Sequence, residues 1–211
     1  MNLAKIQLSQ EELLFVQNAE WLLTKNRIIA KVYEMFGSLI VDAQKLFSVP
    51  SLLPSEIFLT PPKISKGENY NGLPYVMLDY PRCFGKCDIF AIRTMFWWGN
   101  FFSTTLHLKG KYQNELAPVL KKHLPVLAAS DFFISIHNDE WRHDFEADNY
   151  LAIRSADAVT VNENLIRKDF CKLSGKVSLA EWNDAPAKLL RFYETIIGEF
   201  KINFQGGGRG L

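Results

Sequence analysis

The chain has 211 residues, of which 48% are hydrophobic and 22% are charged. This length and composition predict one compact domain with its own core, and they exclude a disordered or low-complexity protein. The 24 basic and 23 acidic residues give a net charge of +1 at pH 7, which excludes the overall basic excess of many nucleic-acid-binding proteins but allows a local patch.

The first residues lack the uninterrupted apolar run of a secretory signal. The most apolar long window, residues 89–108, is interrupted by charged and polar residues and by Gly99, which is poor material for a transmembrane helix. Three cysteines, an odd number, fit a reducing compartment. We therefore expect a soluble cytoplasmic protein without a disulfide framework or a membrane partner.

The N-terminal region predicts helices. The run Ser9-Gln10-Glu11-Glu12 fits a capping box, and Leu13, Val16 and Leu23 extend an apolar face from it. Apolar residues then recur at three- and four-residue spacing from Ile29 to Phe47. We expect two helices here, or one helix bent near Asn26, ending before the prolines at positions 50, 54, 61 and 62.

The middle of the chain predicts antiparallel strands. Residues 75–80, 88–98 and 101–109 are rich in β-forming residues, and a tight turn at Gly99-Asn100 joins the last two. A short helix over about 114–124 should follow, then a strand over 132–137 and a return strand from Trp141.

Two helices are expected at the C-terminal end, one over about Asn164–Leu173 stopped by Gly175, the other from Asp184 with Pro186 in its first turn. The second should face the core with Leu189, Leu190, Tyr193, Ile196, Ile197 and Phe200. The order of elements predicts an α+β fold: a mainly antiparallel sheet of about five strands, packed by N-terminal and C-terminal helices. Residues 1–204 should form this single domain, and the glycine-rich residues 205–211 a flexible tail.

The register of the hairpin over 88–109 decides which side chains share a face of the sheet. With a three-residue loop, Trp98-Gly99-Asn100, the apolar side chains of both strands fall on one face. Arg93 and Trp97 then share the other face with Thr105, and His107 lies next along it. We expect the protein's own helix or a ligand to cover this face, because a fully solvated face has no need of aromatic side chains.

The candidate ligand on this face is a small anionic or carbonyl-bearing molecule, since the fork of Arg93 suits a carboxylate or a phosphate. Prolines at both ends of residues 74–81 predict a short strand that would present Asp79, Tyr80 and Arg82 at its exit. We therefore propose a candidate ligand site formed by Arg93, His107, Thr105, Trp97, Asp79, Tyr80 and Arg82. The alternative is that Arg93 pairs with a local carboxylate beneath packed protein and is not open to a ligand.

A second candidate is a divalent-metal site in the acidic run from His137 to Asp144. On strands joined by a tight turn, His137 and His143 could converge with Asp139 or Asp144, although the spacing is not that of the helical H-E-x-x-H pattern. The chain lacks phosphate-binding G-x-x-x-x-G-K-[ST], dinucleotide-binding G-x-G-x-x-G before a helix, and the nucleophile elbow G-x-S-x-G.

A third candidate is single-stranded RNA, suggested by seven basic against three acidic residues over 61–111, interleaved with aromatic residues. The sequence thus favours a ligand- or partner-binding domain, followed by a metal-assisted enzyme of unknown class and then by an RNA-binding module. Whether the protein is an enzyme stays open, and a homo-oligomer is compatible with each alternative.

Overall fold

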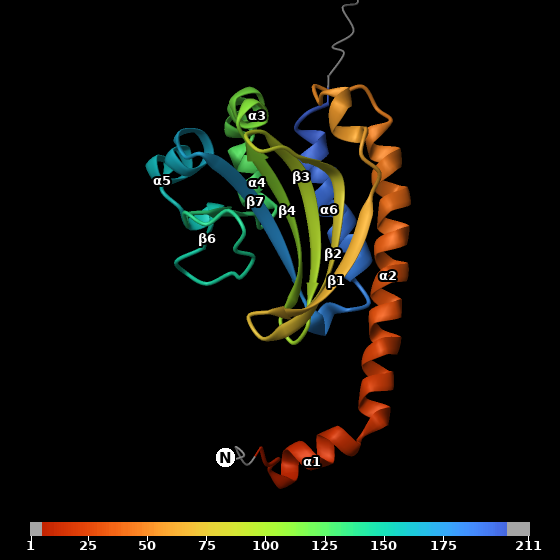
Figure 1. Cartoon of the computed structure of the whole chain (residues 1–211). Coiled ribbons are helices and arrows are strands. Elements are labelled where there is room, and N and C mark those ends of the chain that lie inside the picture. The colour runs from red at the N-terminus through yellow and green to blue at the C-terminus, as the bar shows by residue number, and fades with distance from the viewer. Residues whose placement is uncertain (1–5, 202–211) are drawn as a thin grey trace, which may run out of the picture.

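The computed structural model describes residues 6–201, so the expected tail at 205–211 lies outside the described residues. The chain forms a seven-stranded antiparallel sheet with the order β1-β2-β3-β4-β7-β5-β6, packed by helices (Figure 1). The predicted α+β class is confirmed, and the expected number of about five strands is too low. The strands are β1 (Lys63–Tyr70), β2 (Leu73–Phe84), β3 (Ile89–Trp97), β4 (Phe101–Lys109), β5 (Phe133–Ser135), β6 (Tyr150–Ala152) and β7 (Phe170–Ser178).

The longer helices stand at the two ends of the chain, and shorter ones lie between β4 and β7. They are α1 (Gln10–Gln17), α2 (Ala19–Phe47), α3 (Lys111–Lys122), α4 (Leu124–Ala129), α5 (Ala158–Asn162) and α6 (Ala185–Gly198). Short 3-10 turns occupy Ser55–Phe58, Ile153–Ser155 and Leu179–Glu181, and a π-helical turn occupies Glu163–Arg167. Among the described residues, no helix has the length and apolar character needed to cross a membrane.

The start of α1 matches the predicted capping box. The Ser9 hydroxyl accepts a hydrogen bond from the Glu12 backbone N–H at 3.2 Å, and the Glu12 carboxylate accepts one from the Ser9 N–H at 2.7 Å. The break between the two N-terminal helices lies at Asn18 and not near Asn26, because the Asn18 side chain caps α2 by accepting from the Trp21 N–H at 3.1 Å. From there α2 runs for 29 residues without interruption.

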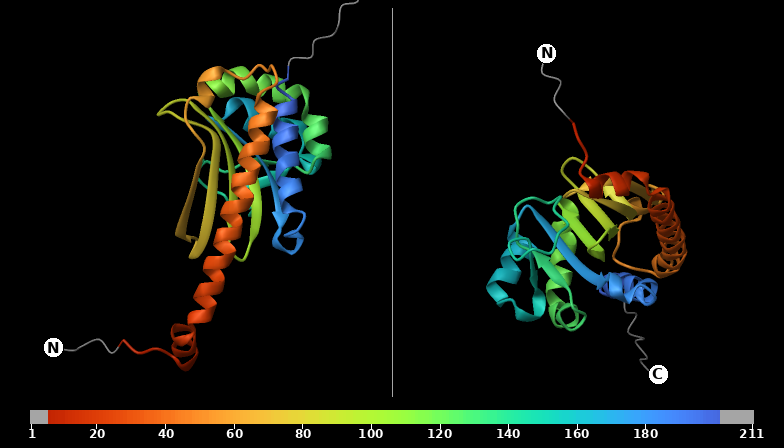
Figure 2. Two further views of the ribbon diagram at one scale, coloured as in Figure 1. Left: turned by 90° about the vertical axis from the view of Figure 1, so that its right-hand side faces the viewer. Right: turned by 90° about the horizontal axis from the view of Figure 1, so that it is seen from below.

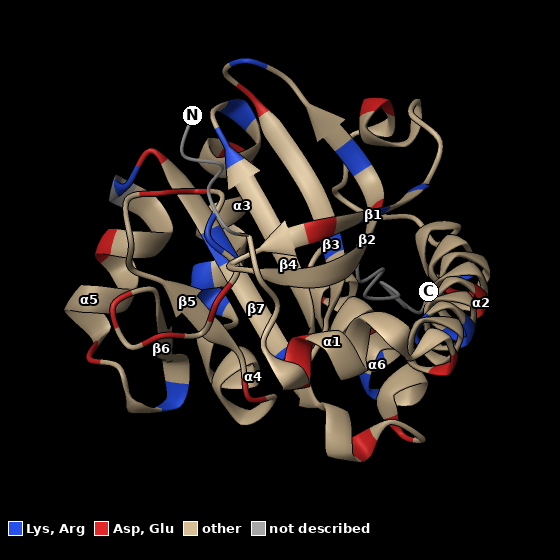
Figure 3. Cartoon of the chain, turned by 60° about the horizontal axis from the view of Figure 1, so that its bottom comes forward, with Lys and Arg blue, Asp and Glu red and all other residues tan. Residues whose placement is uncertain are grey.

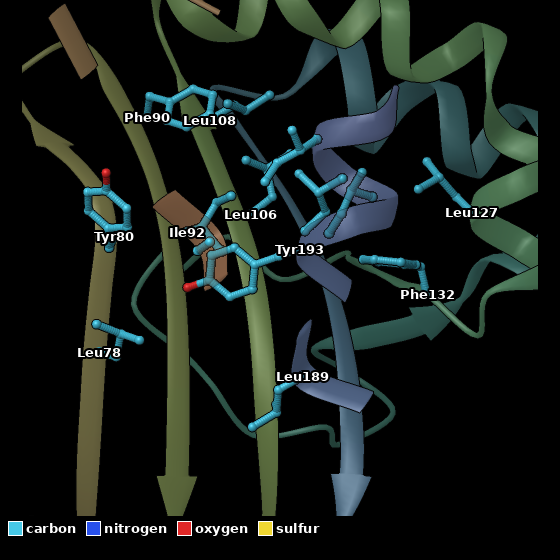
Figure 4. Close-up of a cluster of buried hydrophobic side chains, with 14 of the residues drawn as sticks. Leu78, Tyr80, Phe90, Ile92, Leu106, Leu108, Leu127, Phe132, Leu189 and Tyr193 are labelled. Atoms are coloured by element: carbon cyan, nitrogen blue, oxygen red, sulfur yellow. The ribbon is translucent and has the colours of Figure 1, made fainter. Parts of the chain in front are cut away.

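One face of the sheet forms the hydrophobic core. Helices α2 and α6 lie against this face (Figures 1 and 2). Side chains of alternate strand positions meet them there, and α3 and α4 add leucines at one side (Figure 4). The predicted inward face of α6 is confirmed, with Leu189, Tyr193 and Ile196 buried. The core strand positions include Leu78, Tyr80, Phe90, Ile92, Phe102, Leu106, Leu108 and Leu173.

The expected helix over 164–173 is wrong beyond its first turn. Residues 170–178 form β7, which pairs with β4 along its whole length and with β5 on its other side. Gly175 does not end a helix here; it lies within the strand, where an added Cβ would overlap the ring of Phe192 from α6. The preference of this segment for helix is overridden by its place between two strands of the sheet.

The connection between β4 and β7 also differs from the expectation. The strand predicted over 132–137 is present as the short β5, but its partner begins at Tyr150 and not at Trp141. Residues 136–149 form an irregular segment between them, which we call the covering segment. It lies over the face of the sheet opposite the core, and it carries the acidic residues seen there in Figure 3.

Candidate functional site

The face of the sheet opposite the core carries a layer of polar side chains. In the β3–β4 pair, Arg93 lies opposite Thr105, and Ala91 lies opposite His107. Phe90 opposite Leu108 and Ile92 opposite Leu106 point the other way into the core. This is the predicted three-residue-loop register, with Gly99 at a positive φ of 72° in the turn, so Arg93 and His107 do project from one face.

The covering segment, and not a helix, lies over this polar layer. Its Trp141 ring contacts the His107 ring, with 5.6 Å between centroids, and the guanidinium carbon of Arg93 lies 5.6 Å from the same indole. The hydroxyl of Tyr70, from β1, accepts hydrogen bonds from the backbone N–H groups of His143 at 2.6 Å and Asp144 at 3.2 Å. A single phenol thus fixes the middle of the segment against the sheet.

Arg93 is held in a fork-to-fork ion pair. Its Nε and Nη2 atoms donate to the two carboxylate oxygens of Asp79 on the neighbouring strand β2, at 2.7 and 3.3 Å. Its Nη1 lies 3.4 Å from Nε2 of His143, and its guanidinium carbon lies 5.2 Å from the centroid of the Phe84 ring. The local carboxylate partner weighed in the sequence is therefore Asp79, and the Arg93 side chain stays 18% exposed.

His107 is buried under the covering segment. Its Nε2 lies 3.1 Å from a carboxylate oxygen of Glu140, which also accepts from Lys109 at 2.7 Å. Burial, and then the nearby cations Lys172 and Arg93, lower the pKa of His107 to about 3. His107 is consequently a neutral imidazole that donates to Glu140. Thr105 lies deeper, with its hydroxyl 2.7 Å from that of Ser174.

Lys172 is the main residue of this layer that the sequence did not single out. Its side chain is 1% exposed, its Nζ donates to the backbone carbonyl of Arg142, and it lies 5.4 Å from the centroid of the Tyr150 ring. Burial, and then the charge of Arg93, lower the pKa of Lys172 to about 7. The alternation of Lys172, Ser174 and Lys176 with apolar neighbours was the signal for a strand with one polar face.

Two hollows open at the edge of the covering segment. The first has a volume of about 260 Å³ and the second about 430 Å³, and both are bounded by Tyr70 and Trp141. The remaining residues around the first are Ser65, Tyr75, Met77, Asp79, Arg93, Met95 and His143. Around the second they are Asn71, Trp97, Asp139, Arg142, Asp144 and Glu146. The first hollow therefore reaches Arg93 on the polar face, and we call it the Arg93 pocket.

Tyr80 and Arg82 do not join the Arg93 pocket. The strand that was expected to end near Pro81 continues to Phe84, with a shift of register between Asp79 and Arg82. Tyr80 follows Val76 and Leu78 on the core face of β2, because alternate residues of a strand share a face. Its ring contacts Phe47 there, with 5.6 Å between centroids. Arg82 donates from Nε to the carbonyl of Pro61 at 2.7 Å.

The four candidate metal ligands have separate partners. Nδ1 of His137 accepts from the backbone N–H of Asp139 at 2.9 Å, His143 faces Arg93, and Asp144 pairs with Arg142 at 2.7 Å. Within residues 6–201, no three His, Cys, Asp or Glu side chains are grouped so that they could hold a metal ion. The close spacing in sequence does not bring these side chains together, because the segment is an extended irregular loop and not two strands joined at a tight turn.

The aromatic residues of the RNA candidate are divided between two environments: Tyr70 contacts Tyr75 and Trp97, whereas Tyr80, Phe84 and Trp98 contact other side chains. Trp97 packs edge-on against Tyr70 and Phe101, with centroid separations of 5.1 and 5.4 Å, and its Nε1 donates to the Tyr70 carbonyl at 3.2 Å. Trp97 is buried in this arrangement. Its ring thus serves as a wall of the second hollow and not as an open stacking surface.

Comparisons with protein-family models, with curated proteins and with solved structures gave no match to this chain.

Proposed function

We propose that the chain binds a small molecule bearing a carboxylate or a comparable anionic group in the Arg93 pocket. The observation that carries this proposal is a hollow of about 260 Å³ that reaches a partly exposed arginine on an otherwise buried polar face. Its volume lies just below the range of about 300–1,000 Å³ typical of drug-sized ligands, which suits a small one.

The guanidinium of Arg93 has N–H groups that remain available to a ligand. It carries five N–H groups, of which Asp79 takes two and the His143 nitrogen faces one more. Asp79 also holds the guanidinium plane in place, so an incoming anion would meet a pre-oriented fork with little loss of side-chain entropy.

The electrostatic surroundings favour an anion. Burial, and then the positive charges of Lys172 and Arg93, lower the pKa of His143 well below its ordinary value. The same two cations contribute to the low pKa of His107. Although Asp79 already pairs with Arg93, a negative group in the pocket would lie near both of these cations, whereas a positive group would add to their charge.

The remaining walls suit an apolar body. Met77 and Met95 form one side, and the rings of Tyr70, Tyr75 and Trp141 form the others. Methionine side chains adapt to irregular ligand shapes, and aromatic rings offer flat contact surfaces. The combination supports a ligand with one anionic end and a small aromatic or aliphatic remainder.

The geometry favours this function over the two alternatives that the sequence left open. The histidine and aspartate side chains proposed for a metal already have separate partners, and Trp97 of the RNA candidate is buried against Tyr70 and Phe101.

Calorimetric titration with acetate, phenylacetate, phosphate and the neutral phenylacetamide tests the proposal. We expect phenylacetate to bind at least tenfold more tightly than phenylacetamide, because only the carboxylate can use the fork of Arg93. Arg93→Lys should weaken phenylacetate binding at least tenfold, since lysine keeps the charge but lacks the fork. Arg82→Lys, on the same sheet but outside the pocket, is the matched control and should bind as the parent does. Equal affinity for acid and amide, or no binding of any probe, would contradict the proposal.

A further inference from the structure

The N-terminal helices form an arm that extends beyond the body of the molecule (Figures 1 and 2). None of the residues of α1 is buried, and the first buried residue of α2 is Ile29. The ion pair between Lys25 and Glu68 of β1 marks where α2 passes the end of the sheet. We call residues 6–28 the arm.

The arm is unusually apolar for an exposed structure. Of the nineteen large hydrophobic side chains that are exposed among the described residues, nine lie between Ile6 and Leu23. Four of them, residues 13–16, are consecutive in α1, so they point around the whole circumference of the helix. The first turn of α1 is polar, with Gln10, Glu11 and Glu12, but the turn that follows is apolar on all sides, and such a surface is normally enclosed by other protein. These nine residues are Ile6, Leu8, Leu13, Leu14, Phe15, Val16, Trp21, Leu22 and Leu23.

The exposed area matches what a dimer requires. The nine residues are 45–93% exposed. At roughly half of the ~150–250 Å² that an aromatic side chain buries, which is taken here as a rough upper figure for the aliphatic ones as well, they offer on the order of 700–1,100 Å². Single-chain proteins seldom expose more than a few hundred Å² of contiguous apolar surface. Two copies that covered most of this area would bury about 1,200–2,000 Å², which is the size of a stable, specific interface.

The charges on the arm are arranged in two complementary parts. Between residues 6 and 24 there are three glutamates and no lysine or arginine. Between residues 21 and 33 of α2 the only charged residues are Lys25, Arg27 and Lys31, all basic. Within the chain, Arg27 pairs with Glu20, Lys25 pairs with Glu68, and Glu12 caps α1. Among the described residues, Glu11 and Lys31 form no ion pair, so Glu11 of one copy can pair with Lys31 of another, and two-fold symmetry repeats the same pairing.

We infer that the partner of the arm is a second copy of this chain. In the resulting dimer, α1 of each protomer packs on residues 21–33 of the other, with the apolar side chains between the helices and Glu11 near Lys31 of the partner. The acidic character of α1 disfavours an anionic membrane surface, where interfacial helices place lysine and arginine on the polar face. This inference is independent of the Arg93 pocket.

Sedimentation equilibrium of the full chain tests the dimer. We expect the parent to be dimeric at micromolar concentration, and Leu14→Glu combined with Val16→Glu to raise the dimer dissociation constant at least tenfold. Both residues are 70% exposed, so the folded monomer should tolerate the change. Val159→Glu, at a residue of α5 that is 68% exposed, is the matched control and should stay dimeric. Circular dichroism and thermal unfolding check that each variant is folded.

A charge exchange tests the proposed pairing itself. Glu11→Lys and Lys31→Glu should each weaken the dimer, and the two together should restore it, because opposite charges again face each other. A monomer at all concentrations, a dimer indifferent to the arm substitutions, or failure of the double exchange to restore association would overturn the inference. Binding of the parent to phosphatidylcholine vesicles without self-association would instead identify the arm as a membrane anchor.

Discussion

Tyr70 shows how a single side chain can organise an irregular segment. Its hydroxyl accepts two backbone N–H groups of the covering segment, from His143 and Asp144, and its ring lines both hollows. Burial raises the pKa of Tyr70, so the phenol stays neutral at physiological pH. No sequence pattern marked this tyrosine as an anchor for another segment, because its partners are backbone groups that lie 73 and 74 positions away.

Removing this hydroxyl should loosen the covering segment. We expect Tyr70→Phe to lower the free energy of unfolding by about 1–3 kcal/mol, the usual cost of leaving partly buried N–H groups without an acceptor. Urea denaturation measures the loss, and limited proteolysis should cut residues 136–149 faster than in the parent. Tyr75→Phe, in the same pocket, is the control; an equal effect of both substitutions would show that the hydroxyl of Tyr70 does not hold the segment.

At the scale of elements, strand β7 is the main element that the sequence did not predict, and it differs from the elements that were predicted in how it is stabilised. Local patterns identified the capping box at Ser9, the β3–β4 register and the inward face of α6, because each depends on neighbours close in sequence. Strand β7 depends on β4 and β5, which lie far away along the chain. The same limitation hid Lys172. The core position of Tyr80, in contrast, follows from the alternation of β2, because Tyr80 is two residues after Leu78.

Gly175 provides a test of this packing. Gly175→Ala should destabilise the protein by about 1–3 kcal/mol, because the added methyl group must displace the ring of Phe192. Gly37→Ala serves as the matched control within α2, where no atom lies within 4 Å of the added methyl group. It should stabilise the protein by about 0.5–1 kcal/mol through helix propensity. Thermal unfolding of both variants measures the effects, and a neutral Gly175→Ala would contradict the close contact between β7 and α6.

At the scale of the whole molecule, the two faces of the sheet are built on different principles. One face is a continuous apolar core beneath α2 and α6. The other holds Asp79, His107 and Lys172 out of water beneath a segment without regular structure, and His143 and Asp144 of that segment are buried with them. The core follows from hydrophobic periodicity, whereas the polar layer arises from pairings between distant segments, so the sequence predicted the first more fully than the second.

The buried amine of Lys172 should make global stability depend on pH. In the unfolded chain this lysine keeps its proton up to a pKa near 10.5, whereas in the folded chain its pKa is about 7. Between these values the unfolded state binds the extra proton, so the contribution of Lys172 to stability rises with pH. Relative to Lys172→Met, the parent should gain a few kcal/mol of unfolding free energy between pH 7 and 9.5.

Urea denaturation at both pH values measures this difference. Lys176→Met, an exposed lysine on the same face of β7, is the control and should follow the parent at both pH values. A difference between parent and Lys172→Met that stays constant with pH would show that the folded protein keeps Lys172 protonated throughout.

The position of Trp141 between the two hollows connects them. The indole is 47% exposed, and it forms part of the wall of both hollows. Because the ring is shared, a molecule that pushes it aside in one hollow changes the shape that is available in the other. Two different compounds could therefore influence each other's affinity across a single side chain, without any movement of the strands beneath.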